Sequence, residues 1–221
     1  MSQITLFNGF PAKGQPHFAS EHISISDFLN FVKYGKWKHL IEPIRIEPDS
    51  KKRAALKRNI PSLTISGVFE ERKEENLLEH SGFICIDIDH FTDKTQLLTD
   101  PYTYALMKSA SGGGLAVIVK IDKEKHKESF KWLQNYYYKF FGIVVDSAPS
   151  NVASLRFVSY DPEIYVNEKS KKSKTLLLTP KKVKSLPIVL PQNKVGELVR
   201  ECVDAGKDLA PDYEKYRNLG F

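Results

Sequence analysis

Cysteine is nearly absent from this sequence, which has 221 residues and only two cysteines, Cys85 and Cys202, far apart in the chain. The sequence therefore predicts no disulfide framework, and a reducing cytoplasmic location fits. Long apolar runs are also missing, since no stretch approaches the roughly 18–20 residues that a membrane-spanning helix needs. The first residues lack the charged and apolar regions of a signal peptide. We therefore expect no membrane partner.

The composition favours a folded domain with a basic surface. Hydrophobic residues make up 41% of the chain, and its length suits one large domain or one domain with a small appendage. The net charge of +6 is weak evidence by itself, but basic residues cluster between Lys51 and Arg58 and between Lys169 and Lys184. Such clusters either bind phosphates through counterion release or form a solvated face and a linker. The candidate DNA-binding residues are Lys57, Arg58, Lys171, Lys172 and Lys174.

The pattern of apolar residues predicts a mixed order of helices and strands. Strands are expected at 63–69, 83–89, 103–108, 115–121 and 155–160, with a short strand or turn at 143–146. Helices are expected at 26–32, 49–58, 70–79, 93–98 and 123–141, while Pro43 and Pro48 interrupt the chain between the first two. This order favours an α+β or α/β domain with a largely antiparallel sheet.

A change in character after Asn167 divides the chain. Residues 1–168 are expected to form the main domain, and residues 169–194, rich in lysine and proline, to form a linker. Residues 195–221 are expected to begin a helical C-terminal segment. Because they are too few to bury a core of their own, we expect either that this segment is cut short in a fragment of a longer protein or that it packs back on the domain.

Two carboxylates end the most apolar strand pattern, Phe83-Ile84-Cys85-Ile86-Asp87-Ile88-Asp89. Residues two apart on a strand point to the same face, so Asp87 and Asp89 lie on one side and the isoleucines face the core. Neighbouring carboxylates repel each other unless a cation lies between them, and oxygen ligands suit Mg or Mn. The alternative is a strand end with two solvated acids, but the depletion of Asp in strands favours the metal site.

A turn rich in glycine and serine, Ser109-Ala110-Ser111-Gly112-Gly113-Gly114, joins the strands expected at 103–108 and 115–121. Serine hydroxyls and glycine amides can bind phosphate, although the same residues also form plain hairpin turns. Lys108 and Lys120 flank the turn and could add positive charge.

Two further residues are candidates for the same chemistry. Asp146 follows the apolar run 143–145 and could be a third acid, although a lone Asp in that position is more often a cap or turn residue. Arg156 lies within an apolar strand pattern. A partly buried arginine needs an anion, which is either a carboxylate of the protein or a phosphate.

In chain order, these features resemble the archaeo-eukaryotic primase superfamily, whose motifs are an Asp-x-Asp on a strand, a Ser-x-His-type turn and strand, and an Asp after apolar residues. More narrowly, residues 55–167 resemble the N-terminal primase-like domain of VirE-type proteins from bacterial mobile elements and phages. The stretches that carry this resemblance are 59–69, 80–89, 109–115 and 156–162. The resemblance implies a primase-polymerase-like α+β fold, with an RRM-like antiparallel sheet, flanking helices and a smaller N-terminal αβ part.

The resemblance also implies a function. It suggests a metal-dependent primase or primase-polymerase that transfers nucleotides onto a 3′-hydroxyl on a single-stranded DNA template during mobile-element replication. Such domains are often followed by a helicase, although no Walker-type loop occurs in this sequence. By the resemblance, Asp87, Asp89 and Asp146 would hold Mg or Mn. The residues that would face nucleoside triphosphates are Lys108, Ser109, Ser111, Gly112, Gly113, Gly114, Lys120 and Arg156.

One position departs from the superfamily. Its second motif usually carries a histidine where this chain has Ala116. Alanine cannot donate to a phosphate, so nucleotide binding would be weakened or re-routed, for example through Lys120. This departure favours an alternative, a catalytically weak nucleotide- or DNA-binding module of the same fold that serves a downstream helicase. A third interpretation is a metal-dependent nuclease that uses the same carboxylates.

Overall fold

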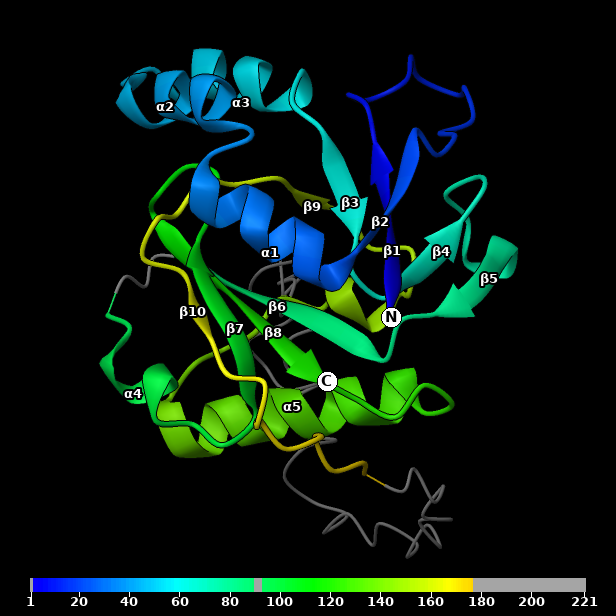
Figure 1. The fold of residues 1–221 in the computed structure, drawn as a ribbon, viewed down its shortest axis with the longest axis vertical. Helices are drawn as coiled ribbons and strands as arrows, with labels where there is room; N and C mark the ends of the chain where they lie inside the picture. The colour runs from blue at the N-terminus through cyan, green and yellow to red at the C-terminus, as the bar shows by residue number, and fades with distance from the viewer. Residues whose placement is uncertain (1, 90–92, 177–221) are drawn as a thin grey trace, which may run out of the picture. The chain divides into compact units, whose positions relative to one another are not determined.

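Two four-stranded antiparallel sheets carry the fold of residues 2–89 and 93–176, which are the residues that the computed structural model describes (Figure 1). Cys202, the expected linker beyond Leu176 and the helical segment expected at 195–221 lie outside the described residues. Every strand pair in the described part is antiparallel, so the expected α+β class is confirmed. Of the described helices, none combines the length and apolar character needed to cross a membrane.

The central sheet has the strand order β10-β7-β8-β6. Strand β6 (Phe83–Asp89) pairs with β8 (Gly114–Lys120) along its whole length. On the other side of β8 lie β7 (Thr103–Lys108) and then the short β10 (Tyr165–Val166). Isoleucine recurs in β6, and leucine, valine and isoleucine fill β8, as suits a buried pleated surface. These two strands and the largely buried β7 confirm the strands expected there.

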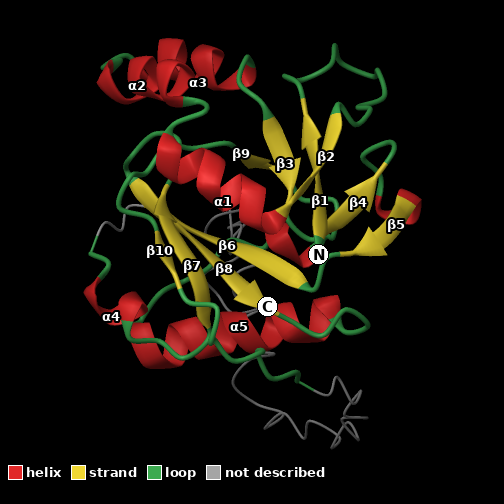
Figure 2. Cartoon of the chain, viewed as in Figure 1, coloured by secondary structure: helices red, strands yellow, loops and turns green. Residues whose placement is uncertain are grey.

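Helix α5 (His126–Phe141) covers one face of the central sheet (Figure 2). Its Phe130, Leu133 and Tyr137 follow helical spacing and are buried in one core with the isoleucines of β6. Gly142 ends the helix in the left-handed conformation, with φ of 67°, which glycine adopts without strain. The short helix α4 (Thr95–Leu98) adds Leu97 to the same core.

The opposite face of the central sheet shares a core with α1 (Ile25–Tyr34), α2 (Lys38–Ile46) and a second sheet. That sheet has the order β2-β1-β3-β9. Its strands are β1 (Gln3–Phe7), β2 (Glu21–Ser24), β3 (Ser62–Thr64) and β9 (Arg156–Phe157). A third, two-stranded sheet pairs β4 (Gly67–Phe69) with β5 (Leu77–His80).

Side-chain caps explain where two of the expected helices begin. The Ser24 hydroxyl accepts a hydrogen bond from the Asp27 amide, and Asp49 accepts from the first amides of α3 (Ser50–Arg58). Both helices are therefore confirmed. The sequence does not predict α2, which contains Pro43. Its buried Ile41 and Ile44 indicate that core packing outweighs the hydrogen bond that proline removes.

Several expected elements differ from the structure. The strand expected at 63–69 is interrupted at Ile65–Ser66, so β3 and β4 belong to different sheets. The helix expected at 70–79 is wrong, because residues 77–80 pair with β4 after a single 3-10 turn at Glu74–Asn76. The strand expected at 155–160 is confined to β9, and residues 143–146 form no regular element.

The beginning of the expected linker remains attached to the central sheet. The Lys171 amide donates to the Pro101 carbonyl and the Ser173 amide to the Lys120 carbonyl, both at 2.8 Å. Ser170 and Ser173 are buried. Residues 170–173 of the expected linker therefore pack against the central sheet.

Candidate functional site

An open pocket of about 230 Å³ lies where the C-terminal end of β6 leaves the core. We call it the carboxylate pocket, because Asp87, Asp89 and Asp146 all line it. Residues of the Gly/Ser turn, α3 and β9 complete its wall. The other lining residues are Lys57, Ser109, Ala110, Ser111, Leu155, Arg156 and Phe157.

The alternation of side chains along strand β6 places Asp87 and Asp89 on the same face of the sheet. Phe83 and Cys85 on the same face are buried, whereas Asp87 is partly exposed and Asp89 is exposed. Because successive side chains alternate, Ile84, Ile86 and Ile88 lie in the opposite core beneath α5. The predicted separation of acids and isoleucines is confirmed, and the acids reach solvent because the strand runs out of the core at this end.

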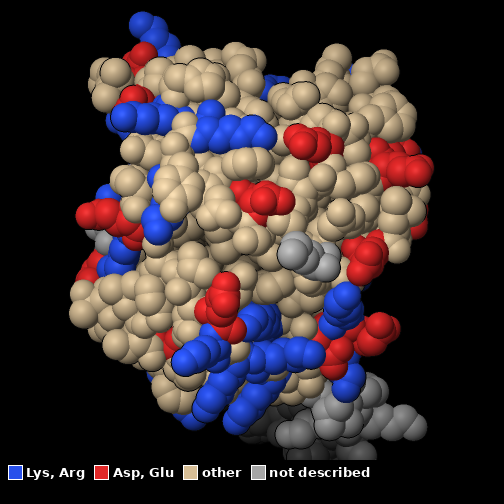
Figure 3. All heavy atoms as spheres, viewed as in Figure 1, with Lys and Arg blue, Asp and Glu red and all other residues tan. Residues whose placement is uncertain are grey.

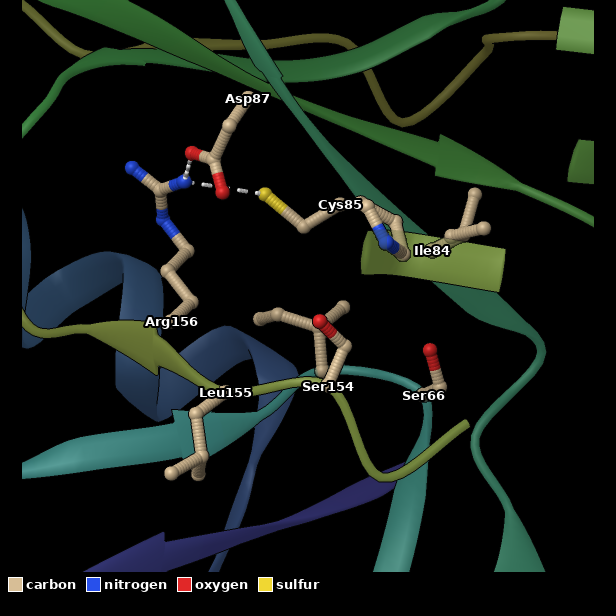
Figure 4. Close-up of a pocket in the computed structure, with 9 residues that line it drawn as sticks. Ser66, Ile84, Cys85, Asp87, Ser154, Leu155 and Arg156 are labelled. Atoms are coloured by element: carbon tan, nitrogen blue, oxygen red, sulfur yellow. Dashed lines mark hydrogen bonds and ion pairs between the residues drawn. The ribbon is translucent and has the colours of Figure 1, made fainter. Parts of the chain in front are cut away.

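Arg156 lies beside Asp87 and is buried, with a side chain only 6% exposed (Figure 4). Its Nη1 forms an ion pair with Asp87 and also donates to Cys85 Sγ at 3.4 Å. Burial alone would lower the pKa of Arg156, but the adjacent Asp87 carboxylate raises it overall. The anion that the sequence requires for this arginine is therefore a carboxylate of the protein. Burial also raises the pKa of Cys85 to about 12, so Cys85 remains an uncharged thiol.

The Gly/Ser turn presents its serines, rather than its glycines, to the pocket. The Ser109 and Ser111 hydroxyls lie 3.3 Å apart. The Ser109 amide donates to the Gly114 carbonyl, and Gly112 adopts a positive φ of 76°. At Gly114 a Cβ atom would lie 2.6 Å from the Ile88 carbonyl oxygen. These two glycines therefore permit the turn and its close approach to β6.

Arg45 of α2 anchors this turn, and the sequence did not indicate it. Its Nη2 donates to the carbonyls of Ser109 and Tyr160 at 3.0 and 2.7 Å. Burial lowers the pKa of Arg45. A buried carboxylate holds the start of the same turn: Asp161 accepts hydrogen bonds from the Lys108 amide at 2.8 Å and from Lys94 Nζ at 3.0 Å. No local pattern could reveal Arg45, because its partners lie 64 and 115 residues away.

Asp146 lines the pocket from the segment after α5. It is exposed, and its Oδ1 accepts from the Ala148 amide at 3.4 Å, at the start of the 3-10 turn Ala148–Ser150. Asp146 is therefore a turn residue, as one interpretation of the sequence has it, and it also shares a pocket with the Asp87 and Asp89 carboxylates.

Residues 55–166, half of the chain, match the model of the family described as BT4734-like, N-terminal domain. The chain belongs to this family. The matched residues of the BT4734-like domain include all those that line the carboxylate pocket. No curated protein and no solved structure matches the chain significantly.

The pocket of this BT4734-like domain does not hold every candidate residue. Lys120 lies at the far end of β8, opposite Phe83, and its Nζ donates to the Glu168 carbonyl at 2.6 Å. Lys108 Nζ lies 3.5 Å from Glu163. Lys171, Lys172 and Lys174 follow β10, and Figure 3 shows basic side chains gathered where Figure 1 draws this segment and α5. The candidates outside the pocket lining are Arg58, Lys108, Gly112, Gly113, Gly114, Lys120, Lys171, Lys172 and Lys174.

The donors in the pocket fit a hard cation in chemical type, but their positions do not form a complete metal site. Carboxylate oxygens are the ligands that Mg or Mn prefers. Within residues 2–89 and 93–176, however, no group of three or more His, Cys, Asp or Glu side chains could hold a metal ion. Arg156 already forms an ion pair with Asp87, so Asp89 and Asp146 are the carboxylates of the pocket that have no ion pair with a described residue.

Proposed function

We propose that this BT4734-like domain is a primase-polymerase-like nucleotidyltransferase that adds nucleotides to a 3′-hydroxyl on a single-stranded DNA template. The observation that carries the proposal is the convergence of Asp87, Asp89 and Asp146 with the turn serines on one pocket, from three distant parts of the chain. The order of these features along the chain resembles that of primase-like domains, which supports the same chemistry. The host process in this proposal is the replication of a mobile element, with a helicase as a partner.

The pocket residues divide the work of such a reaction. The Ser109 and Ser111 hydroxyls donate hydrogen bonds to phosphate oxygens of a nucleoside triphosphate, and Lys57 supplies positive charge at the rim. Because Asp89 and Asp146 do not complete a metal site by themselves, Mg or Mn would be held by these carboxylates together with the phosphates of the bound triphosphate. A divalent ion supplies charge neutralisation of the triphosphate and activation of the attacking hydroxyl. Arg156 orients Asp87 and balances its charge.

A binding module without transfer activity is the second candidate, and two observations favour it. Ala116 lies directly opposite Asp87 and is fully buried, so it offers no donor where the superfamily usually has a histidine. The ion pair with Arg156 also occupies the Asp87 carboxylate, which is then not free to bind a metal ion. A domain with these features could grip nucleotide or DNA for a helicase without transferring nucleotides.

Asp89→Asn provides the cleanest test of transfer. Asp89 is exposed and, within the described residues, its side chain makes no hydrogen bond or ion pair, so the variant should fold normally. The protein is incubated with a primed single-stranded template, labelled nucleotides and magnesium or manganese. We expect extended product, reduced by about 100-fold or more in Asp89→Asn because a carboxylate of the reaction site is lost.

Glu124→Gln is the matched control, because Glu124 is an exposed carboxylate just beyond the opposite end of β8. It should extend primers as the wild type does. Absence of product with either metal, together with retained DNA or nucleotide binding, would refute transfer and leave the binding module. A shortened template that depends on Asp89 would instead indicate a nuclease.

A further inference from the structure

Helix α3 is unusually rich in positive charge and has no buried face. Its nine residues include five cations, Lys51, Lys52, Arg53, Lys57 and Arg58, and no acid. None of its residues is buried, and none of these cations forms an ion pair with another described residue. A helix gains most of its stability by burying one face, and like charges on one helix repel each other. The composition of α3 is therefore better suited to binding a polyanion than to packing against the rest of the domain.

Two aromatic rings extend this basic surface into the carboxylate pocket. Phe157 of β9 lines the pocket, and Lys57 Nζ lies 5.9 Å from the centre of its ring. Phe10 meets Phe157 edge to face, with ring centres 5.7 Å apart, and is 41% exposed. The Phe10 amide donates to the Arg58 carbonyl at the end of α3. We call this surface, made of Phe10, Phe157, Lys57 and Arg58, the Phe10–Phe157 strip.

The chemistry of the strip selects its partner. Cations beside accessible aromatic rings suit a single strand, because its phosphates meet the cations and its unpaired bases can stack on the rings. A duplex keeps its base faces stacked on one another and would use only the cations. An acidic peptide would likewise leave the aromatic rings without a role.

We propose that the Phe10–Phe157 strip binds single-stranded nucleic acid and leads it into the carboxylate pocket. Phosphates lie against Lys57 and Arg58, and bases stack on Phe157 and Phe10. The proposal rests on the proposed function only in the end point of the path, since binding by the strip requires no transfer chemistry. The proposal places the nucleic acid at α3 and not at the lysines that follow β10. Those lysines lie at the end of the central sheet that is farther from the carboxylate pocket.

Binding is measured by fluorescence anisotropy of a labelled thymidine oligonucleotide, with a chelator present and without nucleotides, at several salt concentrations. The aromatic variant is Phe10→Ala with Phe157→Leu, in which leucine preserves apolar packing at the partly buried position 157. We expect about tenfold weaker binding or more, with an unchanged salt slope, because stacking is lost and charge is not. In Lys57→Gln/Arg58→Gln, the salt slope should fall by about 1.4 for two lost phosphate contacts.

Helix α5 offers a matched control. Phe140 is 62% exposed and lies 5.8 Å from Lys139 Nζ, so it repeats the pairing of lysine and phenylalanine away from the carboxylate pocket. Phe140→Ala and Lys131→Gln/Lys139→Gln should bind the oligonucleotide as the wild type does. Circular dichroism and thermal unfolding of every variant separate lost binding from lost folding.

The strip is refuted if its aromatic variant folds and binds as the wild type does. It is also refuted if a duplex or polyglutamate competes as well as the single strand. Equal losses in the α5 controls, or full loss on neutralising Lys171, Lys172 and Lys174 with none at α3, would place binding elsewhere. The two proposals fail separately. A wild type that binds through the strip but extends no primer refutes transfer alone. Folded strip variants that bind the oligonucleotide and extend primers as the wild type does refute the strip alone.

Discussion

The two faces of strand β6 differ sharply, although they belong to the same seven residues. One face carries three isoleucines that are buried under α5. The other begins with buried Phe83 and Cys85 and ends with Asp87 and Asp89 at the carboxylate pocket. Residues that pack in the core and residues that line the candidate site are thus direct neighbours along the strand. Substitutions on the two faces should therefore have different measurable consequences.

The largest loss of stability is expected from Ile86→Ala on the apolar face. Ile86 is fully buried, so truncation removes apolar contacts and leaves a cavity, which lowers the free energy of unfolding by about 2–5 kcal/mol. Urea denaturation measures this change. Asp89→Ala on the exposed end of the other face should stay within about 0.5 kcal/mol of the wild type. Equal losses in the two variants would contradict the separation of the faces.

The next largest effect concerns the ion pair at the boundary between core and pocket. Asp87→Asn leaves Arg156 charged and buried, so we expect a loss of about 3 kcal/mol. Arg156→Met should destabilise less, because the Asp87 side chain is 39% exposed and water can solvate it. The double variant should regain stability relative to Asp87→Asn. A double-mutant cycle in urea measures all three, and additive losses would argue against the pair.

Acidification should loosen the layer that covers the apolar face. His80 Nε2 lies 3.0 Å from His126 Nδ1 at the start of α5, while His80 Nδ1 accepts from the Gly82 amide at 2.9 Å. His126 Nε2 lies 2.9 Å from the Pro149 carbonyl oxygen, so both rings fit their neutral forms. Burial, aided by His126 and Lys123, lowers the pKa of His80 from 6.5 to about 4.

Since the pKa of His80 is lower in the folded state, the unfolded chain binds more protons between these values. The His80 contribution is therefore complete above pH 6.5 and is lost as the pH falls towards 4, by about 3 kcal/mol in total. Free energies of unfolding measured between pH 4 and pH 6.5 test this loss of stability. His80→Gln should flatten the pH dependence, and an unchanged profile would contradict the assignment.

The smallest effect distinguishes two adjacent glycines of the Gly/Ser turn. Gly114→Ala would place a Cβ 2.6 Å from the Ile88 carbonyl and push β8 away from β6, which costs about 1–3 kcal/mol. Gly113→Ala has no atom within 4 Å of the added Cβ and should be nearly neutral. Thermal unfolding compares the two. Equal melting temperatures would show that the turn adapts without strain.

The sequence predicted the elements whose patterns are local and strong. The alternation in β6, the strands β7 and β8, the helices α1 and α3, and the apolar spacing in α5 all appear in the structure. The predictions failed where distant pairing decided the outcome. The charged stretch 70–79 suggested a helix, but pairing with β4 makes residues 77–80 a strand.

The candidate site was predictable as a set of residue types and not as an arrangement. The carboxylates and the turn serines stood out in the sequence, and the structure places them on one pocket. Lys120 stood out equally but lies at the far end of its strand, because β8 runs antiparallel to β6. Arg45 and Phe157 gain their positions only through partners that lie far away in the chain.

By itself, the sequence determined which face of β6 would be apolar, because side chains alternate along any strand. It also determined that Arg156 would need an anion, because a buried guanidinium charge is costly without one. Only the tertiary structure decided that this anion is Asp87 and not a phosphate, because the pairing of β3 with β9 brings residue 156 beside β6. The same packing placed Phe157 beside Lys57, which no local pattern could have shown.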